Sequence, residues 1–208
     1  MSSKFYYKLM AGFYDLLDVI YFCNYKNSPR KKVLEAIKDQ DTILDLCTGT
    51  ATNAIQISQV KPNTKIVGID LSKDMLRIAD DKLKKSNIKN VKLYYMDATH
   101  MKFNDKYFDK IIISLVLHEL EDTLAEQILK EARRVLKNDG EIIVTEWETS
   151  NINWRKIVFF PIHILEPKTY RAFIKKDLYA YFKKFGLEII EVSHCDYSKV
   201  LRVKKVET

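Results

Sequence analysis

The chain has 208 residues, of which 47% are hydrophobic and 30% are charged. A chain of this length can bury roughly 70% of the surface that it exposes when unfolded, so we expect one compact domain. No stretch approaches the ~20 consecutive apolar residues that a membrane-spanning helix needs, and the amino-terminal segment lacks the apolar core of a signal peptide. These features predict a cytoplasmic protein.

The net charge is +7, from 35 Lys and Arg residues against 28 Asp and Glu residues. The basic residues are spread along almost the whole chain, which disfavours a specific nucleic-acid partner and leaves a weak attraction to anionic membrane surfaces open. Cys23, Cys47 and Cys195 have neither CxxC spacing nor a Cys/His ligand pattern, so we expect no disulfide framework and no metal site. Both a monomer and a homodimer remain open.

Short apolar runs alternate with segments of helical spacing, a pattern that predicts a mostly parallel sheet with helices on both faces. The predicted strands of this part are Thr42–Cys47, Lys65–Asp70, Val91–Tyr95, Phe108–Leu115 and Glu141–Trp147. The predicted helices are Ala51–Val60, Lys73–Lys85 with Ser72 as its cap, and Glu121–Lys137, which Gly140 follows in a left-handed turn.

The last part of the chain has a different pattern. Lys168–Lys184 has helical spacing throughout and predicts one helix. Leu187–Ser193 and Lys199–Lys205 read as strands, separated by a polar turn around Asp196. Two strands so close in the chain are expected to pair as an antiparallel hairpin.

A buried strand that runs through a small-residue turn into a helix is the most informative segment, Ile43–Ala51. Such a turn lets the backbone approach a ligand closely. The segment has one glycine and lacks the GxGxxG pattern of dinucleotide binding, so a tight structural turn remains the alternative.

Acidic residues stand at the ends of the first three predicted strands. Asp70 lies 25 positions after Asp45, and Asp97 lies 27 positions after Asp70. Parallel strands bring all three to one edge of the sheet, where carboxylates can accept hydrogen bonds from ribose hydroxyls and from an adenine amine. Each acid could instead be a cap or turn residue, but the ordered set predicts a nucleoside-containing ligand.

At this point the sequence resembles the class I S-adenosylmethionine-dependent methyltransferases, closest to the ubiquinone/menaquinone C-methyltransferases and their small-molecule relatives. The resemblance covers Ser28 to Trp147 and rests on five motifs in order: LDLCTGTA, VGIDLSKDML, YYMDAT, FDKIIISLVLHEL and EARRVLKNDGEIIVTEW. It implies an α/β, Rossmann-like seven-stranded sheet of order 3-2-1-4-5-7-6, with strand 7 antiparallel and helices on both faces. Ala51 stands where the family pattern D-x-x-x-G-x-G has its last glycine.

The resemblance also implies a site for S-adenosylmethionine, with S-adenosylhomocysteine as the product. Asp45 and the Gly49 backbone would frame the methionine part, Asp70 would bind the ribose, Met75 would pack on the adenine and Asp97 would recognise its edge; Met75 could instead belong to the core. The full implied set is Asp45, Cys47, Thr48, Gly49, Asp70, Leu71, Met75, Asp97, Ala98, Ser114 and Leu115.

Two residues are catalytic candidates. His118 follows the fourth strand, and a free imidazole has a pKa near 6.5, which suits a general base; the alternative is that it only orients its loop. Tyr14, in the Tyr14-Asp15 pair, resembles a family tyrosine that closes over the methyl donor. The aromatic segments Phe5–Tyr25 and Ser150–Pro167 would cover the acceptor, which divides the domain into a lid segment (1–27), a cofactor-binding core (28–149), a cap insertion (150–167) and a C-terminal helix with hairpin (168–208).

The sequence thus predicts methyl transfer to a small, hydrophobic or aromatic acceptor, such as quinone-like C-methylation or a related O- or N-methylation. Positioning of the acceptor is the expected main source of catalysis. Three alternatives stay open: a phospholipid, RNA or protein methyltransferase, a nicotinamide-dependent oxidoreductase, and a cofactor-binding protein without catalysis.

Overall fold

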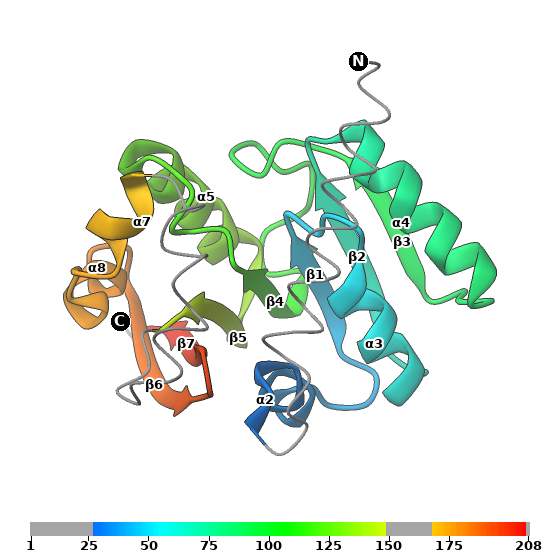
Figure 1. Ribbon diagram of the computed structural model, residues 1–208, viewed down its shortest axis with the longest axis horizontal. Coiled ribbons are helices and arrows are strands. Elements are labelled where there is room, and N and C mark those ends of the chain that lie inside the picture. The colour runs from blue at the N-terminus through cyan, green and yellow to red at the C-terminus, as the bar shows by residue number, and fades with distance from the viewer. Residues whose placement is uncertain (1–26, 149–167, 207–208) are drawn as a thin grey trace.

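The computed structural model describes residues 27–148 and 168–206. In that part of the chain seven strands form one sheet, of order β3-β2-β1-β4-β5-β7-β6 (Figure 1). The strands are β1 Thr42–Leu46, β2 Lys65–Asp70, β3 Val91–Tyr95, β4 Phe108–Ser114, β5 Leu136–Trp147, β6 Leu187–His194 and β7 Ser198–Lys205. The helices are α2 Pro29–Ala36, α3 Thr52–Val60, α4 Lys73–Lys85, α5 Asp122–Val135, α7 Lys168–Phe173 and α8 Leu178–Lys183.

Strand pairing confirms the predicted order and directions. The five strands from β1 to β5 pair in parallel, and β7 inserts antiparallel between β5 and β6. The β6–β7 pair is the predicted hairpin. Because β1 to β5 run the same way, the loops that follow them all open at one edge of the sheet.

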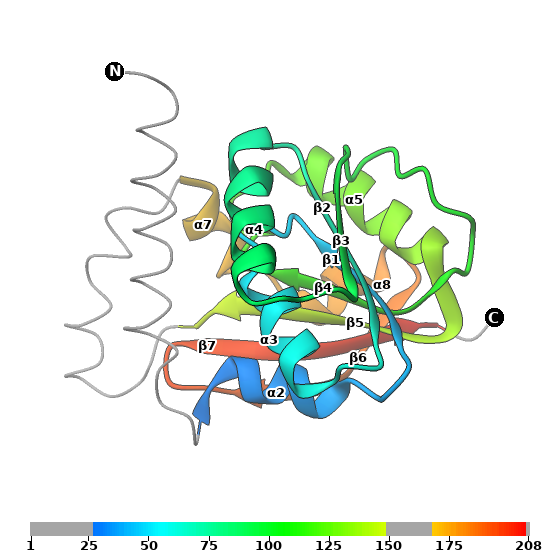
Figure 2. The ribbon, with the colours of Figure 1, turned by 90° about the vertical axis from the view of Figure 1, so that its right-hand side faces the viewer.

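Alternate residues of the central strands enter two separate hydrophobic layers. Ile43, Ile112 and Ile143 pack with apolar residues of α2, α3 and α4. Leu44, Ile111 and Val144 pack with α5, α7 and α8 on the opposite face. Strands that are buried on both faces need hydrophobic residues at successive positions, which explains the Ile- and Val-rich runs of the sequence. Figure 2 shows α2 and α5 on opposite sides of the strands β5 and β7.

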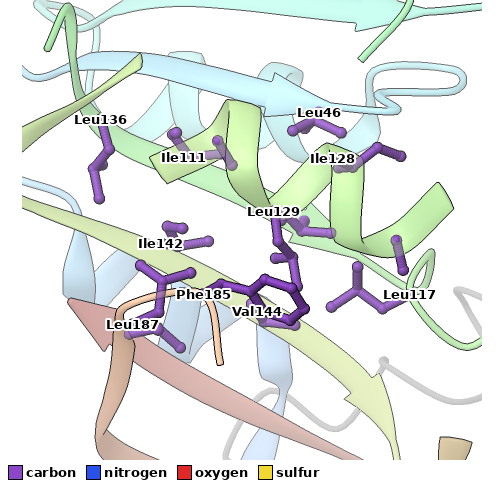
Figure 3. Packing of buried hydrophobic residues seen from close by; sticks show 14 of the residues in the cluster. Leu46, Ile111, Leu117, Ile128, Leu129, Leu136, Ile142, Val144, Phe185 and Leu187 are labelled. Carbon is purple, nitrogen blue, oxygen red and sulfur yellow. The ribbon is translucent and has the colours of Figure 1, made fainter. Parts of the chain in front are cut away.

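The layer under α5 also reaches the loop that follows β4. Figure 3 shows Leu129 of α5 packed over β4 and β5 and Phe185 close to Val144, with Leu136 and Leu117 at opposite ends of the cluster. Leu117 is 1% exposed. A side chain fixed in a close-packed interior leaves its neighbours in the chain little freedom, so this contact positions residue 118.

The prediction of one helix over Lys168–Lys184 was wrong, because the segment forms two helices, α7 and α8, with a break between them. Asp177 caps α8: its Oδ1 accepts the amide hydrogens of Tyr179 and Ala180, at 3.0 and 3.2 Å. An aspartate that bonds to two backbone amides competes with a continuous helix. Helix α2, with Ser28 as cap and Pro29 in its first turn, was not predicted.

The prediction of a left-handed Gly140 was also wrong. Positive φ angles among the described glycines occur at Gly49 and Gly186, and Gly140 lies inside β5. The pairing of β5 with β4 shifts register between Phe108 and Lys110, and a Cβ at position 140 would lie 2.7 Å from Leu136 Cδ1 and 2.9 Å from the Asp109 carbonyl oxygen. Glycine is therefore required here by close approach at a bulge.

Candidate functional site

The loop between β1 and α3 contains three residues in the left-handed conformation. Cys47, Gly49 and Ala51 have φ angles of 55°, 56° and 59°. The buried Asp45 carboxylate accepts the Thr48 hydroxyl at 2.5 Å, which fixes the turn from inside. Burial raises the pKa of Asp45 to about 6, opposed by the hydrogen bonds from Thr48 and the Ala54 amide. Asp45 thus stabilises the conformation of this loop through a buried hydrogen bond.

The structure also corrects the expectation that the helix after β1 begins at Ala51, because α3 begins at Thr52. Ala51 is the N-cap of α3, in the left-handed region, and is fully buried. An L-residue with a Cβ pays roughly 1–2 kcal/mol in this conformation, whereas glycine does not. The loop therefore keeps the backbone path that glycine favours, with alanine in its place.

Asp70 ties two loops together at the end of β2. Its Oδ2 accepts the Gly49 amide at 2.8 Å and its Oδ1 accepts the Ser72 amide at 2.7 Å. Each carboxylate oxygen has further acceptor capacity, so both can also accept hydroxyl groups of a ligand. A Cβ at Gly49 would have no atom within 4 Å, so the space beside this backbone is open to a ligand. The residues therefore fit the ribose and methionyl part of S-adenosylmethionine.

The β3 end supplies the acid expected at the adenine. Asp97 is exposed, and hydrogen bonds from the amide and hydroxyl of Thr99, both at 2.8 Å, lower its pKa and keep it ionised. Met75 is half-buried in the first turn of α4 and belongs to neither core cluster. Leu71 is 59% exposed, directly after Asp70, whereas Ala98 is buried in the core.

The electrostatic environment of this edge is acidic. Burial raises the pKa of the Cys47 thiol to about 12, and nearby carboxylates, those of Asp70, Asp45, Glu119 and Asp97 in this order, add to the shift. A thiol with such a pKa stays protonated and unreactive at neutral pH. A sulfonium ligand carries positive charge, so the cluster of carboxylates favours it electrostatically.

Polar contacts connect the end of β4 with α3 and α2. Ser114 Oγ accepts the Asn53 side-chain amide at 3.0 Å, and Arg30 donates to Asn53 Oδ1 at 3.1 Å. Leu115 is left-handed, with a φ of 56°, and its amide donates to the Thr145 carbonyl at 2.8 Å. Ser114 and Leu115 thus lie at the same edge as Asp45 and Gly49, as expected for neighbouring parallel strands.

His118 forms a buried pair with a glutamate of β5. Its Nδ1 lies 2.5 Å from Glu146 Oε2, and each side chain is 1% exposed. The other carboxylate oxygen accepts the Leu117 amide at 3.0 Å. The ring of Tyr170, on α7, meets the imidazole edge-on with centroids 5.7 Å apart. A carboxylate beside Nδ1 holds the hydrogen there and leaves Nε2 as the basic nitrogen.

Glu146 and Tyr170 were not predicted as site residues. The signal for Glu146 was an acid inside the apolar strand EIIVTEW, since a buried carboxylate requires a partner. Tyr170 offered no signal, because an aromatic at helical spacing is ordinary core. Tyr14 and the segments Phe5–Tyr25 and Ser150–Pro167 lie outside the described residues, so their expected roles remain predictions.

Comparisons with known proteins agree with this geometry. A family model described as a methyltransferase domain matches residues 37–184. The chain belongs to the methyltransferase domain family. The demethylmenaquinone methyltransferase of Lactobacillus johnsonii is 36% identical over 141 residues, which cover 66% of this chain and 57% of that protein. That of Alkalihalophilus pseudofirmus is 30% identical and covers 82% of this chain and 74% of its own length.

Among solved structures, a SAM dependent methyltransferase from Aquifex aeolicus superposes with a TM-score of 0.69 at 21% identity, over 85% of this chain and 89% of that one. At this identity the likeness concerns the fold. The chain spans little more than half the length of the Lactobacillus relative. The comparisons confirm the resemblance inferred from the five motifs and, with it, S-adenosylmethionine as the cofactor of the family.

Proposed function

We propose that this methyltransferase domain transfers a methyl group from S-adenosylmethionine to a carbon of a small quinol-type acceptor. The observation that carries the proposal is the His118–Glu146 pair, which stands at the end of β4 and β5. This is the edge at which Asp70 and the Gly49 backbone meet. A base beside the methyl-donor site is what a hydroxylated aromatic acceptor requires.

The acceptor class is supported by the relatives. Both relatives named above are demethylmenaquinone methyltransferases, whose name specifies a quinone as the methylated molecule. A phenolic hydroxyl is a weak nucleophile until it loses its proton, and its negative charge then increases electron density at ring carbons. A general base is therefore useful for this acceptor and superfluous for an amine or thiolate.

His118 would take the hydroxyl proton on Nε2, while Glu146 stabilises the imidazolium that forms. S-adenosylmethionine, when bound, supplies an activated methyl group, and the electron pair of the broken C–S bond stays on sulfur. The ring carbon that gains the methyl group then loses its hydrogen as a proton to solvent, which restores the aromatic ring as a phenolate. The imidazolium returns its proton to that oxygen, so one proton is released overall. We further propose that Tyr14 and the segments 1–27 and 150–167 cover the acceptor and exclude water.

The test is a methylation assay with purified protein, S-adenosylmethionine labelled in its methyl group, and a reduced demethylated naphthoquinone with a short side chain. The expected product carries the label on a ring carbon, which NMR distinguishes from an O-methyl ether. The oxidised quinone serves as the control acceptor, because it has no hydroxyl proton to lose.

Three results would oppose the proposal: label on oxygen, equal rates with the oxidised quinone, or transfer only to amines or thiols in the same assay. Binding of S-adenosylmethionine is measured separately by calorimetry. A protein that binds the cofactor and methylates no member of the panel would contradict the proposed activity while preserving the family assignment.

A further inference from the structure

The outer face of α7 and α8 combines exposed basic side chains with exposed apolar side chains. Residues 169–186 contain five basic residues and one acidic residue, a net charge of +4 in a chain whose total is +7. Arg171, Lys175, Lys183 and Lys184 are exposed and form no ion pair with any described residue. Ile174 is 39% exposed and Tyr179 is 61% exposed.

The segment has a clear inner face, which makes the composition of the outer face informative. Tyr170, Phe173, Leu178, Tyr181 and Phe182 are buried beneath it. On α8, Tyr179 and Lys183 are four residues apart and lie on the same side of the helix. Arg171 lies on α7, and the exposed Ile174 and Lys175 follow directly after the end of that helix. Figure 1 shows both helices together at one end of the molecule.

The remaining charges of the segment are already engaged. Lys176 pairs with Asp122 of α5 and lies over the rings of Phe173 and Tyr181, at 5.6 and 4.8 Å from their centroids. Asp177 is the one acid of the segment, and its carboxylate caps α8. Among the described residues, the four cations named above therefore have no ion-pair partner and are accessible to an external one.

We propose that the face formed by Arg171, Ile174, Lys175, Tyr179, Lys183 and Lys184 docks on the surface of an anionic lipid bilayer. Basic side chains are attracted to anionic headgroups, and an exposed isoleucine and tyrosine can insert their apolar parts between them. RNA bases can stack on an exposed tyrosine but gain no comparable contact from an isoleucine, whereas both side chains can insert between lipid headgroups, so a bilayer fits this face better. Tyr170 connects this face with the site, because it lies on the inner side of α7 and its ring contacts the imidazole of His118.

Docking in this position brings the acceptor site close to the phase in which a hydrophobic acceptor dissolves. That consequence rests on the proposed function, whereas the docking itself does not. Vesicle binding without cofactor or acceptor therefore tests the surface alone, and its result stands whatever the protein methylates.

The experiment is co-sedimentation of the full chain with vesicles of phosphatidylcholine alone or with 30% phosphatidylglycerol. We expect binding at least ten-fold tighter to the anionic vesicles at 0.1 M salt and a strong loss at 0.5 M salt, because screening shortens the reach of the charges. Each basic residue near such a surface contributes about a five-fold factor, so Lys175→Glu/Lys183→Glu should weaken binding roughly 25-fold or more. Tyr179→Ser should weaken it less and without a change in salt dependence.

The matched control is Lys85→Glu/Lys89→Glu, which makes the same change in net charge at exposed lysines of α4 and the loop after it. Helix α4 lies at the opposite end of the molecule from α7 and α8 in Figure 1. Equal losses in the two double variants would show that net charge alone governs binding and would overturn the proposal, as would equal affinity for neutral and anionic vesicles. Thermal melting of each variant excludes unfolding as the cause of a loss.

Discussion

The two halves of the site are built in opposite ways. At the β1–β3 end, carboxylates such as Asp70 and Asp97 stay accessible to solvent and are organised by backbone amides of the same or the adjacent loop. At the β4–β5 end, His118 and Glu146 are sealed from solvent and organise each other. An accessible carboxylate can exchange water for a ligand, whereas a sealed pair keeps one geometry and one hydrogen position. The first arrangement suits binding and the second suits proton transfer.

The largest effect is expected at the sealed pair. His118→Gln retains a hydrogen-bonding side chain but removes the proton acceptor, so turnover should fall about 10²- to 10⁴-fold while affinity for S-adenosylmethionine stays within a few-fold. Wild-type activity should decline as the pH is lowered and the imidazole becomes protonated, and the residual activity of the variant should lack this dependence. Steady-state kinetics from pH 5 to 9 and calorimetry measure both.

Glu146→Gln is the companion variant, because it keeps the volume but loses the charge that orients and stabilises the imidazole. We expect a smaller loss, about 10- to 100-fold, with the pH dependence retained. If both variants instead lose cofactor binding or melt early, His118 and Glu146 are structural and the comparison between the two halves fails.

Asp45 offers a test of burial within the accessible half. Its pKa is raised from an ordinary value of 3.8 to about 6 in the folded protein, so the folded state holds this proton more tightly than the unfolded state. The stabilisation is complete below pH ~4 and is lost as the pH rises through ~6, a change of about 2–3 kcal/mol by linkage. Urea unfolding of the wild type and Asp45→Asn at pH 4, 5, 6 and 7 measures it.

The difference in free energy of unfolding between the wild type and Asp45→Asn separates the effect of Asp45 from the effects of the other carboxylates. Those of Asp109, Glu131 and Glu141 have lowered pKa values, so their contribution is lost on acidification in both proteins alike. Wild-type stability relative to Asp45→Asn should therefore decline between pH 4 and pH 6. A constant difference would show that Asp45 titrates alike in the folded and unfolded states.

Asp70 tests the accessible half directly. Asp70→Asn keeps one good acceptor oxygen but loses the charge, and charge-assisted hydrogen bonds are worth roughly 1.5–3 kcal/mol against about 1 for neutral ones. Affinity for S-adenosylmethionine should fall about ten-fold, as measured by calorimetry. Because Asp70 also holds the Gly49 and Ser72 amides, the apo protein should melt slightly earlier. Unchanged affinity would remove Asp70 from the cofactor site.

The smallest effect is expected at Ala51. Ala51→Gly removes the cost of a left-handed alanine but adds entropy to the unfolded chain, so the free energy of unfolding should rise by up to about 1 kcal/mol. Ala54→Gly is the matched control, since Ala54 is also fully buried but lies within α3; it should lower stability by about 1 kcal/mol or more. Equal losses in both variants would contradict the assigned conformation of Ala51.

The sequence predicted the accessible half because its signals are local. Asp70 and Asp97 follow apolar strands, and parallel strands place their ends together without further information. Glu146 was missed because its partner lies 28 residues away, and their meeting depends on β4 and β5 being neighbours. The predictions at Gly140 and around Asp177 failed for the opposite reason. They relied on local signals, a glycine after a helix and a helical spacing, and these were overridden by the tight β4–β5 contact and by the cap of α8.

The position of β7 has a consequence for how the protein is made. Strand β5, which carries Glu146, pairs with β7 on its outer side, and Glu146 lies opposite Lys199. During synthesis more than fifty residues separate these two positions, which at 5–20 residues per second amounts to several seconds on the ribosome. For that time β5 is an open edge of Ile and Val residues, a template for pairing with other chains. Chaperone dependence and aggregation of nascent chains should therefore be greatest in this interval and should end when residues 198–205 emerge.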